Sequence, residues 1–259
     1  MKIPVYQVDA FASKAFEGNP AAICPLESWL ADDVMQAVAA ENNLAETAFV
    51  VRREGVRELR WFTPTVEVEL CGHATLAAGF LLLDVLHEEA ESVRFLTRSG
   101  ELVVSRAKDG FALDLPSLPA GACEPPQALL DGLDRRPVEI LAAKNYLCVF
   151  EREDDVRNLA PDFAQLAHCD PYAVIVTAPG EKVDFVSRFF APAHGINEDP
   201  VTGSAHCTLA PYWSKRLGKQ RLRARQISKR GGDLVCEPRG DRVVLEGGCV
   251  LVLEGTIHL

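Results

Sequence analysis

The sequence lacks several patterns that would point directly to a class of protein. It has no Gly-x-Gly-x-x-Gly, no P-loop and no close metal-ligand cluster, so it offers nothing on which nucleotide, flavin or metal dependence would rest. It has no C-x-x-C pair, so the sequence suggests neither a zinc knuckle nor a secreted disulfide framework. We therefore expect no cofactor, no metal, and mostly buried cysteines in a reducing compartment.

Long hydrophobic runs are also absent. The longest uncharged apolar stretch, Ala74–Leu83, is well short of the roughly 20 residues that span a bilayer. The N-terminal segment Met1–Asp9 alternates like a strand and lacks the apolar segment of a secretory signal. We therefore expect a cytoplasmic protein with no membrane partner.

The chain has fewer basic residues (27 Lys and Arg) than acidic ones (37 Asp and Glu). The formal net charge of −10 repels phosphate backbones and anionic membrane surfaces. The basic run from Lys215 to Arg230 is interrupted by apolar residues, and we interpret it as a solvated helix end followed by a loop. Nucleic acid is therefore not expected as a partner.

The rest of the composition is that of a globular protein with much β-structure. At 259 residues and 48% hydrophobic residues, the chain is long enough for one large domain or two half-sized ones. Helical patterns are few, and the two strongest, which begin at Gly72 and Gly203, are apolar on nearly all sides, as a helix surrounded by sheet must be. Helices are predicted at Ala31–Glu41, Gly72–Leu86, Pro161–Ala167 and Gly203–Leu217. Strands are predicted at Pro4–Phe11, Thr47–Val51, Leu59–Phe62, Val93–Thr97, Leu102–Arg106, Phe111–Leu115, Ile140–Ala143, Leu147–Phe150, Ala173–Thr177, Asp184–Phe190, Arg242–Glu246 and Val250–Glu254.

An internal repeat indicates two similar halves. The segment Arg60–Pro64 (RWFTP) reappears as Arg188–Pro192 (RFFAP), and His73–Ala77 (HATLA) reappears in the same order as His206–Ala210 (HCTLA). Between the copies, residues 116–137 hold five prolines, which suits a linker. We predict an N-terminal lobe at residues 1–116, a linker at 117–137 and a C-terminal lobe at 138–259, with the last strand able to return to the N-terminal lobe, and a cleft at their junction.

Each repeat leads from a polar loop into a helix that starts with glycine, at Gly72 and at Gly203. The first backbone N–H groups of a helix attract anions, and glycine lets a ligand approach them closely. Thr202 and Ser204 are expected to be able to cap the second helix. The two helix starts would together hold a substrate carboxylate or stabilise a developing enolate, which would make a metal unnecessary.

Glu46 is the strongest candidate for an acid/base. It follows Leu44-Ala45 and precedes the apolar run Ala48–Val51, so we expect partial desolvation to raise its pKa from about 4.3 toward neutrality. Such a carboxylate suits removal of a proton from carbon and its return. His73, second in its helix, is a candidate for hydrogen bonding to a ligand or to another group at the helix end.

Five ordered motifs together resemble the phenazine-biosynthesis PhzF-like family across nearly the whole chain. They are Gly18-Asn19-Pro20, Asn43–Phe49 (NLAETAF), Arg60–Pro64, Cys71–Ala77 (CGHATLA) and Glu198–His206 (EDPVTGSAH). The resemblance implies an α+β fold of the diaminopimelate-epimerase-like kind, with two pseudosymmetric lobes, each a curved, mostly antiparallel sheet around a central helix. It implies a homodimeric isomerase without a cofactor that acts on a small amino or hydroxy-amino acid-like carboxylate. It also implies Glu46, His73 and Asp199 as catalytic residues, and substrate binding by Asn19, Gly72, Ala74, Thr202, Gly203 and Ser204.

Two alternatives stay open. Epimerases of this fold use a pair of cysteines, of which this chain retains one candidate, Cys71, whereas the second loop offers Asp199 and Thr202. A Cys71-dependent epimerase with Asp199 or Glu46 as its second base is the first alternative. A non-catalytic metabolite-binding or scaffold protein that keeps the fold is the second.

Overall fold

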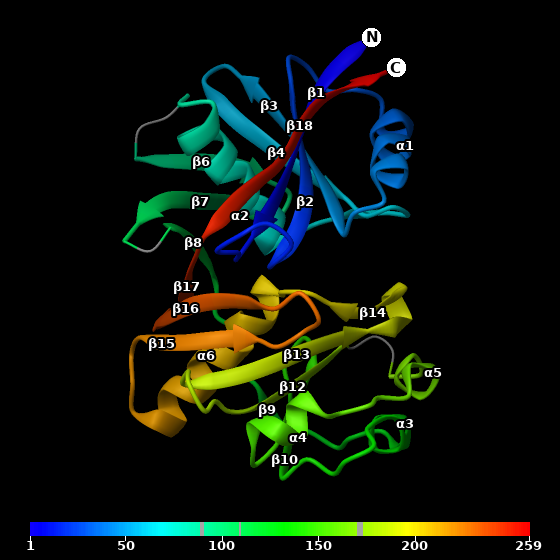
Figure 1. The fold of residues 1–259 in the computed structure, drawn as a ribbon, viewed down its shortest axis with the longest axis vertical. Helices are drawn as coiled ribbons and strands as arrows, with labels where there is room; N and C mark the ends of the chain where they lie inside the picture. Colours follow the sequence, from blue (N-terminus) through cyan, green and yellow to red (C-terminus); the bar gives the residue numbers. More distant parts are fainter. Residues whose placement is uncertain (89–90, 109, 170–172) are drawn as a thin grey trace. The chain divides into compact units, whose positions relative to one another are not determined.

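The computed structural model describes residues 1–88, 91–108, 110–169 and 173–259 (Figure 1). The chain divides into two compact units. Unit 1 comprises Met1–Leu115 and Glu246–Leu259, and unit 2 comprises Pro116–Leu245. Among the described residues, no helix is both long and apolar enough to cross a membrane.

Unit 1 is built on a mixed, mostly antiparallel sheet in the order β18-β1-β2-β3-β4-β6-β7-β8, with the short β5 beside β4. Two of its neighbouring pairs, β2–β3 and β4–β6, are parallel. The strands are β1 (Lys2–Ala10), β2 (Asn19–Leu26), β3 (Glu46–Arg53), β4 (Val56–Phe62), β5 (Glu67–Val68), β6 (Ser92–Thr97), β7 (Gly100–Ala107), β8 (Gly110–Pro116) and β18 (Cys249–His258).

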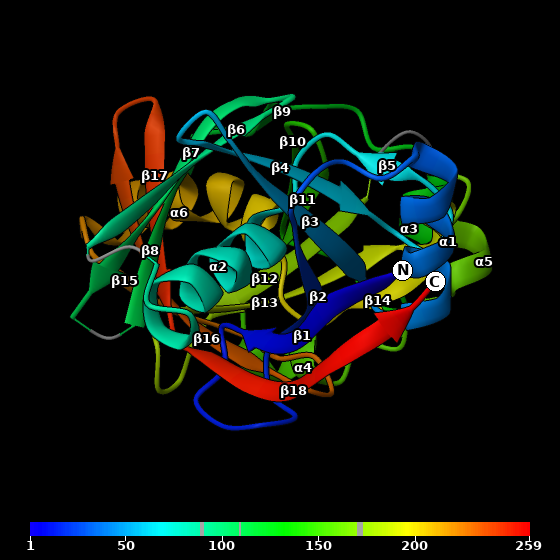
Figure 2. The same ribbon diagram turned by 90° about the horizontal axis from the view of Figure 1, so that it is seen from above.

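The centre of unit 1 is α2 (Gly72–Phe80), which continues as a π-helical turn, η1 (Leu81–Val85). All nine residues of α2 are buried, and the helix contacts β1, β2, β3, β7 and β18 (Figure 2). A helix without a polar face is stable only when apolar surface covers it on all sides. The outer helix α1 (Asp32–Asn42) covers another part of the sheet and buries Met35 and Val38 against Phe49 and Phe62.

Unit 2 repeats this plan around α6 (Gly203–Leu217). Its remaining helices are α3 (Gln127–Gly132), α4 (Glu153–Arg157), α5 (Phe163–Leu166) and the 3-10 turn η2 (Pro192–His194). Its strands are β9 (Gly121–Ala122), β10 (Glu139–Ala142), β11 (Tyr146–Val149), β12 (Val174–Pro179), β13 (Phe185–Ala191), β14 (Ile196–Asp199), β15 (Leu222–Gln226), β16 (Gly232–Arg239) and most of β17 (Arg242–Gly247).

The two units share one series of strand pairings. In unit 1, β2–β3 is parallel, β3–β4 antiparallel, β4–β6 parallel and β6–β7 antiparallel. In unit 2, β11–β12, β12–β13, β13–β15 and β15–β16 follow the same alternation. A short antiparallel strand, β5 or β14, lies beside β4 or β13 in the corresponding place. The pairing series is what duplication of one half-chain produces, in agreement with the sequence repeat.

The boundaries of the units differ from the predicted lobes at the linker. The expected linker, residues 117–137, belongs to unit 2 and contains β9 and α3, whose Leu129 is fully buried in the unit 2 core. The last strand, β18, belongs to unit 1, the return that the prediction allowed for, and pairs there with β1 along its whole length. Proline-rich composition marked the end of the first sheet, but it did not reveal the apolar side chains that attach this segment to unit 2.

The basic run Lys215–Arg230 contains a strand that we did not predict. Only its beginning is the end of α6, and β15 (Leu222–Gln226) alternates between buried and more exposed positions. The interpretation as helix end and loop was therefore wrong for this part of the run. Charged residues at alternate positions face outward from a strand as readily as from a loop.

Gly79 of α2 allows close packing of the helix on β7. A Cβ at this position would lie 2.3 Å from Cγ1 and 2.5 Å from Cβ of Val104. We expect Gly79→Ala to lower the free energy of unfolding by about 1–3 kcal/mol through overpacking, although alanine is the better helix former by about 1 kcal/mol. Urea denaturation would measure this change in the free energy of unfolding. Adding Val104→Ala removes the methyl clashes and should recover part of the loss, whereas a single variant more stable than the wild type would contradict the packing argument.

Candidate active site

The first repeat brings Glu46 and His73 into contact inside unit 1. Glu46 is the first residue of β3 and His73 is the second residue of α2. Their side-chain atoms Oε2 and Nε2 are 3.2 Å apart, and the two side chains are only 15% and 6% exposed. Two of the three predicted catalytic residues are therefore neighbours in a largely dry setting.

Burial determines the charge of His73. Desolvation lowers the pKa of its imidazole to about 3, against the opposing effect of a hydrogen bond to the backbone of Pro20. The ring is therefore neutral at pH 7, and its contact with Glu46 joins a carboxyl group to a neutral imidazole rather than to a cation. A neutral imidazole can both donate and accept a proton.

Two further side chains meet the other nitrogen of this ring. Asn19 Nδ2 lies 3.2 Å and Cys71 Sγ lies 3.5 Å from His73 Nδ1. Asn19, the first residue of β2, has no exposed surface, and Cys71 precedes α2 in an extended conformation. In unit 1 the side chain of Asn19 thus supports the orientation of His73.

The close group of Glu46, Cys71 and His73 also overturns the expectation that the chain has no close metal-ligand cluster.

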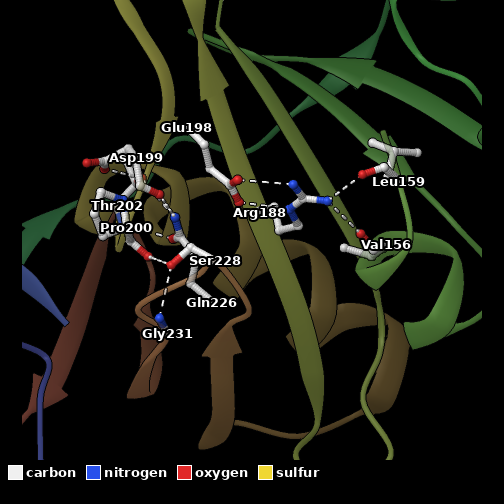
Figure 3. Close-up of polar contacts among 10 residues, drawn as sticks. All are labelled: Val156, Leu159, Arg188, Glu198, Asp199, Pro200, Thr202, Gln226, Ser228 and Gly231. Atoms are coloured by element: carbon white, nitrogen blue, oxygen red, sulfur yellow. Dashed lines mark hydrogen bonds and ion pairs between the residues drawn. The ribbon is translucent and has the colours of Figure 1, made fainter. Parts of the chain in front are cut away.

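The second repeat forms a polar turn in unit 2 (Figure 3). Asp199 ends β14 and is 9% exposed, and the hydroxyl of Thr202 donates a hydrogen bond to its Oδ2. Gln226 closes the turn from β15: its Oε1 accepts from the Thr202 backbone N–H at 2.9 Å, and its Nε2 donates to the Asp199 carbonyl at 2.7 Å. The turn that presents the Asp199 carboxylate is therefore fixed by a buried amide.

The capping role expected of Thr202 is wrong. Thr202 precedes α6 in an extended conformation without a side-chain cap hydrogen bond, because its hydroxyl is directed to Asp199. Cys71 likewise precedes α2 without capping it. Both helices thus begin at a glycine, Gly72 or Gly203, with no capping side chain at the N-cap, which is the arrangement of an anion-binding helix start.

In each unit, an arginine forms a two-bond ion pair, here called the arginine clamp, with a glutamate that precedes the central helix. In unit 2, Arg188 binds both carboxylate oxygens of Glu198, at 2.8 and 3.0 Å, and donates to the carbonyls of Val156 and Leu159 (Figure 3). In unit 1, Arg60 binds both oxygens of Glu67 at 2.7 and 2.8 Å. Paired N–H···O bonds fix geometry as well as charge, so these clamps hold the strand that leads into each loop.

The predicted site residues thus fall into two sets, one in each unit. Unit 1 holds Glu46, His73 and Asn19 together with Gly72 and Ala74 at the start of α2, and unit 2 holds Asp199, Thr202, Gly203 and Ser204. Ala74 is fully buried, so only its backbone is a candidate for contact with a ligand. Sequence reasoning missed Gln226, whose only signal was an uncharged amide within a run of basic residues.

The buried histidines predict a pH dependence of stability. Burial lowers the pKa of His206 to about 4 and that of His73 to about 3, so the unfolded chain binds more protons than the folded one between those values and about 6.5. Stability is then complete above pH 6.5 and falls as the pH falls, by about 2 kcal/mol per histidine at pH 5. Urea denaturation at pH 7 and pH 5 would measure this loss. His206→Asn should remove about half of it, whereas the exposed His168→Asn should leave it unchanged.

Comparison with known proteins places these features in a family. A family model described as phenazine biosynthesis-like protein matches residues 8–117 and 127–255. An uncharacterized isomerase of Pseudomonas aeruginosa is 52% identical over 259 residues, covering 100% of both chains. The crystal structure of a phenazine biosynthesis protein of the PhzF family from Enterococcus faecalis is 44% identical, covers 100% of both chains and superposes with a TM-score of 0.96.

A more distant structure bears on the fold alone. A predicted epimerase from Pseudomonas aeruginosa is 20% identical, covers 98% of this chain and 99% of its own, and has a TM-score of 0.73. Together with the strand pairings, these likenesses confirm the predicted α+β fold of two similar halves, each with a sheet around a central helix.

Proposed function

Because the chain belongs to the phenazine biosynthesis-like family, we propose that it is an isomerase that moves a proton on a small carboxylate-bearing substrate, with Glu46 as the acid/base and without a cofactor. The observation that carries this proposal is the buried contact of Glu46 with His73, 3.2 Å apart. A carboxylate withdrawn from water beside a neutral imidazole suits proton transfer to and from carbon.

In the proposed reaction Glu46 removes a proton from a carbon next to an electron-withdrawing group. The electron pair of the broken C–H bond moves into that group as an enolate, and the proton resides on the Glu46 carboxyl. The proton on the Glu46 carboxyl exchanges with solvent, and delivery of a proton to another carbon, or to the opposite face of the same carbon, completes the isomerisation with no net gain or loss of atoms. His73 orients Glu46 and exchanges protons with it, and Asn19 keeps the imidazole ring in position.

The substrate carboxylate is proposed to bind at glycine-led helix starts. The backbone N–H groups at Gly72 of α2 and at Gly203 and Ser204 of α6 suit an anion, since neither helix carries a side-chain cap. Asp199 and Thr202 are proposed to contact polar groups of the substrate, Asp199 through a proton-accepting carboxylate. A substrate with amino and carboxylate groups, as in an amino or hydroxy-amino acid, would bind the helix starts through its carboxylate and Asp199 through its amino group.

Proton exchange with solvent tests the proposal directly. Candidate amino and hydroxy-amino acids are incubated with the protein in D₂O, and loss of the C–H signal is followed by NMR. The expected result is exchange by the wild-type protein that is lost in Glu46→Gln, which would also identify the class of substrate. Exchange that survives this substitution would refute the role of Glu46. Binding without exchange in either protein would favour a metabolite-binding protein.

One observation favours a second candidate function, a Cys71-dependent epimerase. Cys71 Sγ is 3.5 Å from His73 Nδ1, close enough for the imidazole to accept a thiol proton. Thiol alkylation and Cys71→Ser would then abolish exchange. Loss of exchange in Cys71→Ser while Glu46→Gln stays active would favour this candidate over the proposed one.

A further inference from the structure

Three side chains around His73 are of the types that bind thiophilic divalent cations. The Glu46 carboxylate, the Cys71 thiol and the His73 imidazole each offer one ligand atom, and these atoms all lie within 4.8 Å of one another. All three belong to unit 1, at the start of β3 and the start of α2. The cluster therefore combines sulfur, nitrogen and oxygen ligands on regular secondary structure.

The separation of Cys71 from His73 fits two ligands of one tetrahedral zinc ion, and Glu46 lies at the other ring nitrogen. With Zn–S of about 2.3 Å and Zn–N and Zn–O of about 2.0–2.2 Å, two ligand atoms on one tetrahedral ion are about 3.2–3.6 Å apart. Cys71 Sγ lies 3.5 Å from one ring nitrogen of His73, and Glu46 Oε2 lies 3.2 Å from the other. Since one nitrogen would bind the ion, the Glu46 carboxylate, the most exposed of the three groups, has to move from its contact with the other nitrogen to complete the set.

The surroundings favour zinc over the common hard cations. Mg²⁺ and Ca²⁺ prefer six or more oxygen ligands, whereas this cluster supplies a single carboxylate beside a thiol and an imidazole. The backbone of Pro20 forms a hydrogen bond with the His73 ring, as outer partners of metal-binding histidines do. Cys71 is 5% exposed, so the partly exposed Glu46 side marks the path of entry.

We propose that Glu46, Cys71 and His73 form a three-ligand site for a thiophilic divalent cation such as Zn²⁺, with a fourth position open to water. The Cys71 thiol releases its proton to solvent on binding. An inhibitory effect rests on the proposed function: a cation on the Glu46 carboxylate blocks its acid/base role, so zinc should inhibit exchange reversibly and a chelator should restore it.

Cobalt binding tests the site without any assay of activity. Co²⁺ is added to chelator-treated protein, and the thiolate-to-cobalt charge-transfer absorption is recorded together with the visible bands of a tetrahedral ion. We expect one equivalent to bind to the wild type and Zn²⁺ to displace it. Cys71→Ser should lose the thiolate band, whereas Cys249→Ser, which changes another unit 1 cysteine outside the cluster, should keep it. Absence of the band in the wild type, or its survival in Cys71→Ser, would overturn the proposal.

A second variant keeps the test decisive if Cys71→Ser fails to fold. Glu46→Gln changes a partly exposed side chain without altering its size, and its fold is checked by circular dichroism. It should weaken Co²⁺ binding by at least about 10-fold, the lower end of what loss of even an outer-shell partner costs. Unchanged affinity would remove Glu46 from the site. Exchange measured with chelator and without metal tests the proposed function separately, so failure of either idea is recognised on its own.

Discussion

Glu46→Gln is expected to slow solvent exchange of the substrate proton by about 10²–10⁴-fold, the usual contribution of a positioned acid/base group. Glutamine has the size of glutamate and can keep the contact with His73, but its amide does not accept the proton from carbon. The loss should therefore appear in the exchange rate and not in the fold. The rate would be measured by NMR in D₂O, with a chelator present, for wild type and variant under equal conditions.

The matched control for this experiment is Glu41→Gln. Glu41 lies in α1, close to Glu46 in the sequence, but its side chain is exposed. Its replacement makes the same change of charge and should leave the rate within about 2-fold of the wild type, since solvent and salt screen an exposed charge. An equal loss in both variants would mean that net charge, and not the position of Glu46, controls the reaction.

Trp213→Ala is expected to lower the free energy of unfolding by about 3–5 kcal/mol, the range for truncation of a large buried aromatic residue. Trp213 lies in α6, has no exposed surface and stacks on Phe185 with ring centroids 5.8 Å apart and planes within 6°. Its Nε1 donates a hydrogen bond to Thr177 Oγ1 at 3.0 Å. The variant leaves a cavity between the helix and its sheet and also removes this hydrogen bond.

Urea denaturation would measure the loss, and two other variants show where it comes from. Trp213→Phe keeps an aromatic ring against Phe185 and should lose less than half as much. Trp29→Ala removes a tryptophan whose Nε1 also donates a hydrogen bond, to Glu58 at 2.6 Å, but whose side chain is only partly buried. A loss at Trp213 no larger than that at Trp29 would show that α6 is not the centre of unit 2.

Helices α2 and α6 were predictable from the sequence because each begins with an apolar helical pattern that has to be buried. A run such as Gly72–Phe80 without a charged residue must be buried on all sides, and a protein of many short strands has sheet to cover it. The repeat then implied that both halves use the same solution. Agreement between local pattern and overall plan made this part of the fold readable.

Strand β2 was not predicted, for a physical reason. It contains Pro20 and Pro25, and proline lacks the N–H that a central strand donates. It is nevertheless central, between β1 and β3. The structure accommodates both prolines at positions of intermediate exposure, so tertiary packing overrides the local signal.

The sequence allowed the residues of the site to be predicted, but not the contacts between them. The motifs identified Glu46, His73 and Asp199, but sequence order does not indicate that Asn19 and Cys71 meet the same nitrogen of His73. Nor does it indicate that Gln226, from a different strand, closes the turn at Asp199. Such contacts depend on which strands are neighbours, and strand neighbours are set by the whole fold.

The pairing of the first strand with the last has a consequence for how the protein is made. Lys2 lies opposite His258, so β1 is synthesised long before its partner β18. Unit 2, which is continuous from Pro116 to Leu245, is complete before β18 is synthesised. Domains ordinarily fold in the order of their synthesis. Here unit 1, whose synthesis begins before that of unit 2, can complete its sheet only after unit 2 has been made, and until β18 is synthesised the β1 edge lacks this partner and is open to wrong pairings.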